Sequence, residues 1–223
     1  IPKNINRSAL HPIGIGQGLR TKINANIGTS ADYPFLEREL EKLEIAIQAG
    51  ADTVMDLSTG GDLATIRKKI IACSAIPVGT VPIYQTAIEA KIERGNIVDL
   101  TAEDIFSVTE RHAQDGVDFM TVHCGIALEA LAKLENQGRV TDIVSRGGAM
   151  LAAWMIHNER ENPFYEEFDR LLEIALCYDV TLSLGDSLRP GCLADATDRA
   201  QIQELVTLGT LVDRARQAGV QVI

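Results

Sequence analysis

Short apolar runs alternate with amphipathic stretches along most of this chain. Leu36, Leu40, Leu43 and Ile47 recur at helical spacing, and Gly50 follows at the point where that helix should end. The same spacing and the same end signals predict further helices over 63–73, 82 to about 95, 101–116, the stretch from Gly125 to about 136, 149–159, 163–177 and 198–217.

Between the helices lie short apolar segments that end in glycine or in polar residues. They predict seven strands, over 22–28, 51–57, 77–81, 118–122, 141–144, 181–184 and 220–223. Strands that alternate with helices favour an α/β fold, and seven such units favour a (β/α)8 TIM-type barrel over an open sheet. We expect an irregular segment over 1–20 and a barrel over 21–223, truncated before its eighth unit.

Local capping signals support these boundaries. Gly50, Gly116 and Gly219 each stand between a helix and the next strand, in joints that resemble one another: Gln-Ala-Gly-Ala-Asp, Gln-Asp-Gly-Val-Asp and Gln-Ala-Gly-Val-Gln. Thr101, with an aspartate three residues on, predicts a capping box. Ser30 or an aspartate two residues later is the expected cap of the first helix. The repeated joints are what a βα-repeat fold produces.

Composition narrows the class of partner. The net charge of −10 argues against general nucleic-acid binding, although a local basic pocket for one phosphate stays possible. No apolar run approaches the roughly 20 residues that a membrane-spanning helix needs. The four cysteines are well separated and form no Cys-x-x-Cys pair, which favours reduced thiols and a cytoplasmic location.

Polar residues gather where the predicted strands end. In a barrel these ends converge on one face, and the set comprises Asn24, Asn26, Asp56, Ser58, Tyr84, His123, Ser145, Arg146, Asp186 and Arg189. The segment 145–148, Ser-Arg-Gly-Gly, combines a hydroxyl, a guanidinium and a helix start, which suit a phosphate group. The set indicates a small phosphorylated substrate that contains nitrogen.

Each of these residues also has a structural interpretation. Asp56 and Asp186 could be turn or cap residues, His123 could be a hydrogen-bonded core histidine, Tyr84 could simply pack, and Arg189 could pair only with Asp186. What favours function is their concentration at successive strand ends.

Histidines and cysteines give weaker signals. Cys124 follows His123, but adjacent strand residues point to opposite faces, so a shared metal or nucleophile role is not expected. Surface or structural roles are expected for the other three histidines: His11, His112 and His157.

Five segments, in order along the chain, resemble one enzyme family. They are 22–30, 51–60, 77–84, 143–148 and 182–191, the last reading Leu-Ser-Leu-Gly-Asp-Ser-Leu-Arg-Pro-Gly. Together they are similar to the phosphomethylpyrimidine synthase family of thiamine biosynthesis, and the similarity covers nearly the whole chain.

This resemblance implies a (β/α)8 barrel and a radical S-adenosylmethionine enzyme, a carbon–carbon lyase. The implied reaction rearranges 5-aminoimidazole ribonucleotide into 4-amino-5-hydroxymethyl-2-methylpyrimidine phosphate. The family's substrate-binding positions correspond to Asn26, Met55, Tyr84, His123, Ser145, Arg146, Gly147, Asp186, Ser187, Leu188 and Arg189. Periodicity alone would assign Met55 to the core.

The resemblance also implies partners and cofactors. They are S-adenosylmethionine, a 4Fe-4S cluster and zinc or another divalent metal, with the cluster and metal ligands expected beyond Ile223, so the chain alone should bind substrate at best. The family suggests a homodimer, with no nucleic-acid or membrane partner.

Two alternatives stay open. A paralogous group, the 5-hydroxybenzimidazole synthases of anaerobic cobamide biosynthesis, resembles the chain as well and is expected to use the same ribonucleotide and cofactors. The other alternative is a non-catalytic barrel that binds a phosphorylated ligand, against which stands the exposed strand edge that an incomplete barrel would leave.

Overall fold

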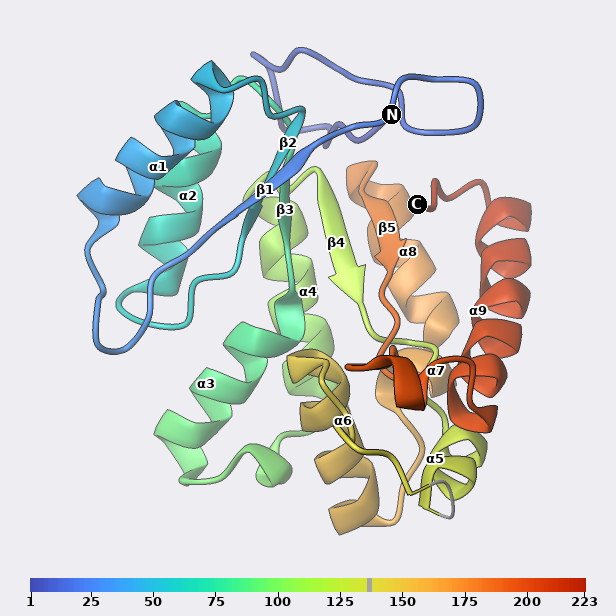
Figure 1. The fold of residues 1–223 in the computed structure, drawn as a ribbon. Coiled ribbons are helices and arrows are strands. Elements are labelled where there is room, and N and C mark those ends of the chain that lie inside the picture. Colours follow the sequence, from blue (N-terminus) through green and yellow to red (C-terminus); the bar gives the residue numbers. More distant parts are fainter. Residues whose placement is uncertain (136–137) are drawn as a thin grey trace.

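The chain folds into one parallel β-sheet with helices on its outer side, as seen in a computed structural model that describes residues 1–135 and 138–223. The strands are β1 (Asn24–Ile27), β2 (Thr53–Asp56), β3 (Val78–Thr80), β4 (Phe119–Val122) and β5 (Thr181–Leu184). They lie in sequence order and all neighbours are parallel. The helices between them provide the crossovers that parallel neighbours require (Figure 1).

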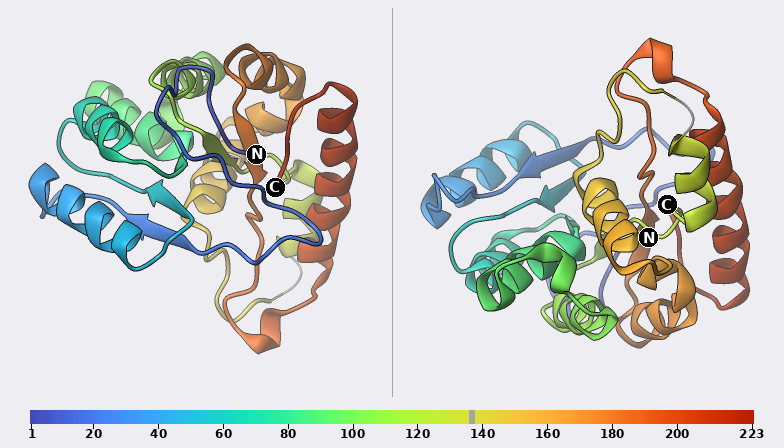
Figure 2. Two further views of the ribbon diagram at one scale, coloured as in Figure 1. Left: turned by 90° about the horizontal axis from the view of Figure 1, so that it is seen from above. Right: turned by 90° about the horizontal axis from the view of Figure 1, so that it is seen from below.

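The predicted helices are present with close to their predicted limits. Those of the first half are α1 (Leu36–Gln48), α2 (Leu63–Cys73), α3 (Pro82–Arg94), α4 (Ala102–Gln114) and α5 (Leu128–Glu135). Those of the second half are α6 (Arg146–Asn158), α7 (Pro163–Glu166), α8 (Phe168–Tyr178) and α9 (Arg199–Gln217). Two 3₁₀ turns, η1 (Ile97–Asp99) and η2 (Leu193–Asp195), complete the described elements. Figure 2 shows the helices outside a curved sheet.

The caps explain most of these boundaries. Thr101 and Asp104 form the predicted capping box at the start of α4. Gly50, Gly116 and Gly219 have φ of 89°, 97° and 82°, so each ends its helix in the left-handed region that glycine tolerates best.

The predicted cap of α1 is wrong. Its N-cap is Phe35, which makes no side-chain cap bond. Ser30 instead pairs with Tyr33 through two backbone hydrogen bonds, in a turn before the helix.

The strand predicted over 141–144 is also wrong. The Asp195 carboxylate accepts hydrogen bonds from the backbone N–H groups of Val140 and Thr141, at 2.8 and 2.9 Å. Asp142 has a positive φ of 54°, which no strand accommodates. This segment therefore lies outside the sheet, and β4 pairs directly with β5.

The last predicted strand forms only in part. Val222 makes one parallel bridge to Leu182 of β5, supported by hydrogen bonds from Ile223 N–H to the Leu182 carbonyl and from Leu182 N–H to the Gln221 carbonyl, both 2.9 Å. Within the described residues, β1 and this short pairing form the two edges of the sheet. The structure thus confirms a parallel α/β fold, whereas the closure and strand count of a (β/α)8 barrel stay predictions.

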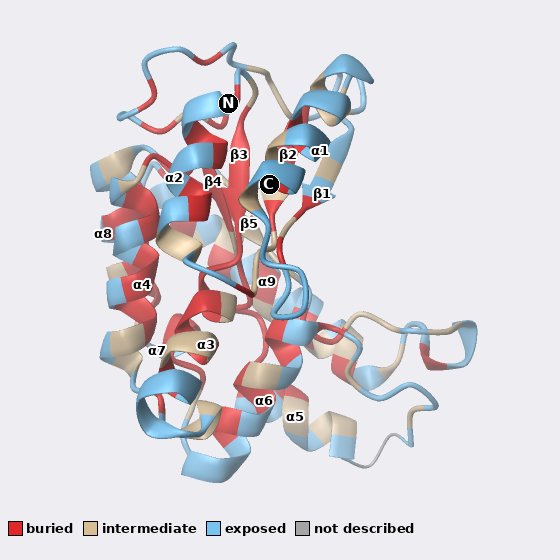
Figure 3. Ribbon diagram, turned by 90° about the vertical axis from the view of Figure 1, so that its left-hand side faces the viewer, coloured by how far each residue is buried: buried red, intermediate tan, exposed pale blue. Residues whose placement is uncertain are grey.

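The sheet has an apolar outer face and a more polar inner face. Val54, Val78, Met120, Val122 and Leu182 alternate outward and are at most 1% exposed against the helices. Figure 3 shows the buried positions of the strands and of the inward helix faces. The inner face carries the residues that the next subsection describes.

The N-terminal segment, residues 1–20, contains no helix or strand, but it is anchored. Asn4 is fully buried, and its side chain donates to the carbonyls of Ala113 and Val117 at 2.8 and 2.9 Å. Its backbone N–H donates to the Asp118 carboxylate, and Arg7 lies 3.6 Å from the same carboxylate. Residues 1–20 therefore lie at the amino-terminal ends of the strands (Figure 1).

Candidate functional site

A cavity of about 520 Å³ opens at the carboxyl ends of the strands, a volume within the usual range of roughly 300–1,000 Å³ for small-molecule sites. It is lined by residues from β1, from the loops after β1, β2 and β5, from helices α1, α3 and α6, and from the segment before α6: Asn26, Ile27, Gly28, Thr29, Ser30, Lys42, Leu57, Thr59, Tyr84, Val144, Arg146 and Arg189. Four of the predicted site residues are among them, so the fold brings these distant positions together.

The lining of this cavity is positively charged. Lys42, Arg146 and Arg189 line it, and no acidic residue does among those that the structure describes. Lys42 also pairs with the buried Glu39, 2.6 Å away, which offsets part of its charge. A protein with a net charge of −10 thus concentrates cations at one concave place, which suits an anionic ligand.

Arg146 is placed by the start of α6. Ser145 is the N-cap, and its hydroxyl accepts the N–H of Gly148 at 3.2 Å. Arg146 is the first helical residue, and its guanidinium stacks over the Tyr84 ring at 5.2 Å from the centroid. The guanidinium therefore adjoins the first turn of α6, whose free N–H groups favour negative charge.

His123 lies beneath this helix start. Its side chain is buried, and a Cβ placed on Gly147 would lie 2.6 Å from its Nδ1, so only glycine fits there. Burial, together with the positive charge of Arg189, lowers the pKa of His123 to about 4, which keeps the ring neutral at pH 7. Nδ1 is buried without a hydrogen-bond partner among the described residues.

Cys124 points away from His123, as strand alternation predicts. Its side chain is fully buried in the apolar core, and burial raises the pKa of its thiol to about 12. The two neighbouring residues share no site.

Asp186 and Arg189 belong to the loop after β5. Arg189 donates to the Asp186 carbonyl at 2.8 Å, and its guanidinium lies 3.9 Å from the Asp186 carboxylate. Both side chains are half exposed, whereas Ser187 and Leu188 between them are fully buried. Leu188 packs in the core and its N–H donates to Glu204, so this residue can offer a ligand only its carbonyl oxygen.

Asn26 and Met55 are neighbours across β1 and β2. The parallel register places Asn24 beside Thr53 and Asn26 beside Met55. Side-chain hydrogen bonds from Thr53 to Asn24, 2.8 Å, and from Asn24 to Asn26, 2.9 Å, show that these residues share the inner face. Met55 is partly buried beside Asn26, and it is not among the residues that line the cavity.

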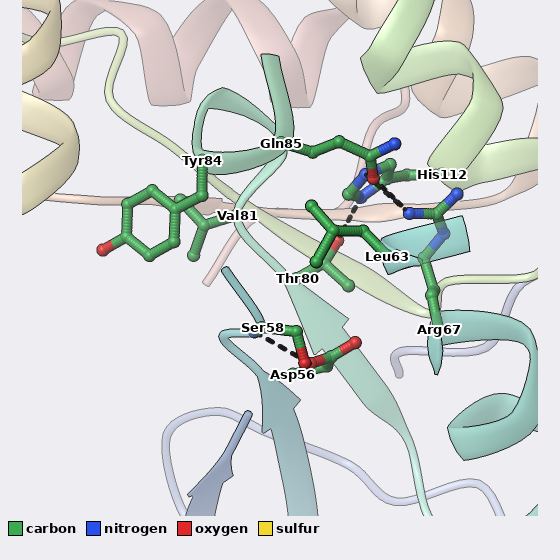
Figure 4. Close-up of a pocket in the computed structure, with 9 residues that line it drawn as sticks. All are labelled: Asp56, Ser58, Leu63, Arg67, Thr80, Val81, Tyr84, Gln85 and His112. Atoms are coloured by element: carbon green, nitrogen blue, oxygen red, sulfur yellow. Dashed lines mark hydrogen bonds between the residues drawn. The ribbon is translucent and has the colours of Figure 1, made fainter. Parts of the chain in front are cut away.

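Asp56 and Ser58 lie at a different cavity, of about 20 Å³, outside the sheet (Figure 4). The Asp56 carboxylate accepts both the N–H and the hydroxyl of Ser58, at 3.0 and 2.5 Å, so it closes a turn. Burial raises the pKa of Asp56. The structural interpretation of Asp56 is therefore the one that the contacts support, and the fold does not bring this pair to the larger cavity.

The same small cavity borders a buried polar network. His112 contacts Thr80 at 2.8 Å and Gln85 at 2.9 Å, and Arg67 donates to Gln85 and Asp115. Figure 4 shows Arg67 of α2, Gln85 of α3, His112 of α4 and Thr80 of β3 meeting in this network. Burial lowers the pKa of His112 well below its ordinary value, so the network holds a neutral imidazole. The predicted structural role of this histidine is confirmed.

Sequence reasoning missed two charged residues: Lys42, which lines the larger cavity, and Glu204, which accepts hydrogen bonds from the loop that carries Arg189. Lys42 stands three residues after Glu39 in α1, and the buried Glu39 also accepts the N–H of Gly28 at 2.7 Å. Glu204 interrupts the apolar side of α9, where every other buried position is Ala or Leu. The sequence signal that could have revealed them is a glutamate on an apolar helix face: Glu39 in α1 and Glu204 in α9.

No metal or cluster site is formed by this part of the chain. In residues 1–135 and 138–223, no three His, Cys, Asp or Glu side chains gather as they would around a metal ion. The four cysteines are free thiols. None of the helices described here is long and apolar enough to cross a membrane.

Comparison with known proteins gives close relatives. The model of the radical SAM ThiC family matches residues 1–223. The phosphomethylpyrimidine synthase of Moorella thermoacetica is 64% identical over 99% of this chain and 51% of its own length. The 5-hydroxybenzimidazole synthase BzaB of the same organism is 56% identical over all of this chain and 52% of its own length. The chain thus spans about half the length of the curated relatives it matches.

Among solved structures, dihydropteroate synthase from Thermus thermophilus aligns with 91% of this chain and 87% of its own. The TM-score is 0.34, and the sequence identity is 17%.

Proposed function

This chain belongs to the radical SAM ThiC family, and on that premise we propose that its full-length protein is a phosphomethylpyrimidine synthase. The substrate of this reaction is 5-aminoimidazole ribonucleotide, and the product is 4-amino-5-hydroxymethyl-2-methylpyrimidine phosphate. The cavity at the carboxyl ends of the strands binds the ribonucleotide.

The charge of the cavity is the observation that carries this proposal. Arg146 and Arg189 face one space with no acidic lining residue among those described, and the first turn of α6 adds backbone N–H groups. A phosphate at Arg146 receives charge-assisted hydrogen bonds there. Asn26 offers amide groups to the ribose or the aminoimidazole, and Tyr84 keeps the Arg146 guanidinium in place by stacking.

His123 serves this substrate in its neutral form. A neutral imidazole can donate one hydrogen bond and accept another, and its buried Nδ1 has no partner among the described residues. Met55, Asp186, Ser145 and Gly147 complete the proposed contacts, together with the carbonyl oxygens of Ser187 and Leu188, because the N–H groups of these two residues are bonded to Glu204. Each of these assignments follows from the family resemblance and from proximity to the cavity.

The described residues do not fit the cofactors that the family implies. A 4Fe-4S cluster needs grouped cysteine thiolates, whereas Cys124 is buried with a raised pKa and the four thiols do not gather. We therefore derive no reaction step through a cluster or a divalent metal, and we assign the binding of S-adenosylmethionine, the cluster and zinc to the full-length protein. A homodimer in the cytoplasm remains part of the same proposal.

One specific observation keeps a second product as an alternative. The chain is also 56% identical to a 5-hydroxybenzimidazole synthase from an organism whose phosphomethylpyrimidine synthase is 64% identical. Because both relatives come from one organism, the higher identity supports the pyrimidine product. Anaerobic turnover of the full-length, cluster-reconstituted protein with the ribonucleotide, S-adenosylmethionine and a reductant decides between them. Hydroxymethylpyrimidine phosphate in the mass spectrum supports the proposal, and hydroxybenzimidazole replaces it.

A binding measurement tests the cavity itself. Arg146→Gln removes one charged contact to phosphate, worth about 1.5–3 kcal/mol, so the Kd for the ribonucleotide should rise roughly ten- to hundredfold. Arg160→Gln is the matched control, because Arg160 follows the same helix and also stacks on an aromatic ring, Trp154, but at the far end. Equal affinities for both variants in calorimetry would remove Arg146 from the phosphate site.

A further inference from the structure

Glu204 is a buried carboxylate whose bonds reach the loop after β5. It lies on α9 within the buried face formed by Ala200, Leu208, Leu211 and Ala215, and it is only 1% exposed. Its two oxygens accept the consecutive backbone N–H groups of Ser187 and Leu188, each at 2.7 Å. Both oxygens of the carboxylate are thus used on one peptide segment.

The same segment is held from its other side. Arg139 donates to the Leu188 carbonyl at 2.6 Å. Its guanidinium also forms two hydrogen bonds with Asp198, at 2.6 and 2.9 Å, and Asp198 is the N-cap of α9. Helix α9 therefore fixes the N–H of Leu188 directly and its carbonyl through Arg139.

Burying the Glu204 carboxylate costs desolvation free energy. Burial raises the pKa of Glu204, while the two N–H groups oppose that shift by stabilising the charged form. An apolar residue at this position would avoid the buried charge but would leave the N–H groups of Ser187 and Leu188 without their acceptor. What the carboxylate adds is a defined backbone geometry between Asp186 and Arg189.

We propose that Glu204 is the positioning residue that sets the 186–189 loop, and with it the Arg189 guanidinium, at the cavity. Arg139 acts with it through the Leu188 carbonyl. The inference rests on the proposed function insofar as Arg189 contacts the ribonucleotide. A displacement of about 1 Å at a binding group is enough to cost a large factor in catalysis.

The competing interpretation is that Glu204 only stabilises the fold. Asp118 is a matched control, because its buried carboxylate also accepts two backbone N–H groups, those of Asn4 at 3.0 Å and Val78 at 2.8 Å. It immediately precedes β4, at the amino-terminal end of that strand, whereas the 186–189 loop follows the carboxyl end of β5. Asp52, which accepts the N–H of Ile23 at 2.8 Å, is a second control at the same end.

The test compares Glu204→Gln with Asp118→Asn and Asp52→Asn in the full-length protein. The glutamine side chain fills nearly the same volume as the glutamate, but its NH₂ group faces one of the two donors, so the loop should shift. We expect the Kd for aminoimidazole ribonucleotide to rise about tenfold in E204Q and to stay within about twofold in the controls, at a temperature where all are folded. Arg139→Lys should weaken binding in the same direction and serves if E204Q does not fold.

A double variant separates positioning from stability. If Glu204 acts through Arg189, the E204Q substitution should change the Kd little when Arg189→Gln is already present, whereas independent effects would multiply. Multiplying effects, or an equal loss of affinity in D118N, would overturn the proposal.

Amide hydrogen exchange tests whether Glu204 holds the 186–189 loop without any need for substrate. Without any ligand, the amides of Ser187 and Leu188 should lose protection in E204Q and keep it in D118N. If the wild-type protein does not bind the ribonucleotide, the proposed function fails, and this exchange measurement alone decides the positioning role. Unchanged protection in E204Q would refute it.

Discussion

Two helical glycines in this protein should respond in opposite ways to the same substitution. Gly147 is in the first turn of α6, where a Cβ would meet the ring of the buried His123. Gly209 is in the middle of α9, where a Cβ would meet nothing within 4 Å. Alanine therefore adds the same methyl group once to a filled space and once to an open one.

The magnitudes follow from these surroundings. Overpacking costs about 1–3 kcal/mol, and alanine regains up to about 1 kcal/mol over glycine in a helix, so Gly147→Ala should lose about 1–2 kcal/mol of unfolding free energy. Gly209→Ala meets no clash and should gain about 0.5–1 kcal/mol. In a chain of this size each kcal/mol corresponds to about 2–4 °C in Tm.

Urea and thermal unfolding of both variants, followed by circular dichroism, measure the two signs. The two glycine sites differ in one respect: the His123 ring packs against Gly147, and nothing packs against Gly209. If G147A proves as stabilising as G209A, then the His123 ring does not occupy the space beside Gly147, and the buried position assigned to it is refuted.

Two further predictions concern buried titratable groups. Burial lowers the pKa of both His112 and His123 below the ordinary value of about 6.5, so the unfolded chain takes up their protons at higher pH than the folded one. The stability from keeping them neutral is fully present above about pH 6.5 and is lost as the pH falls, by up to about 1.4 kcal/mol per pH unit for each histidine. Urea unfolding between pH 5 and 7.5 checks this, and a flat profile would contradict it. Because burial raises the pKa of Cys124 to about 12, iodoacetamide at pH 8 should label the exposed Cys73 and Cys177 in the folded protein and Cys124 only after unfolding. Peptide mass spectrometry reads this order, and early labelling of Cys124 would show that its surroundings open.

Local signals in the sequence were sufficient for the helices and for most strands. Thr101 with Asp104, and Gly50, Gly116 and Gly219, place helix ends through contacts a few residues away. The prediction of a strand over 141–144 was wrong because of a distant residue. The Asp195 carboxylate, 55 residues from Val140 in the chain, accepts the Val140 N–H that a neighbouring strand would otherwise bond. No periodicity within the segment could show that.

The sequence located some residues of the candidate site and misplaced others. Family resemblance and strand ends found Asn26, Tyr84, Arg146 and Arg189, and all four line one cavity. Asp56 follows the same strand-end rule but points outward, because one residue of strand register decides which face a side chain takes.

Glu204 stayed hidden for a different reason. Its importance lies in two bonds to a loop that precedes it by 16 and 17 residues, and only the packing of α9 shows them.

The attachment of the 186–189 loop to α9 has a consequence for how the protein is made. Strands β1 to β4 and their helices can pair as they leave the ribosome, because their contacts lie behind them in the chain. The segment 139–141 and the loop after β5 cannot, since Asp195, Asp198 and Glu204 are synthesised later. The scaffold can thus assemble first, and the ligand-facing loops reach their final form only when α9 has docked.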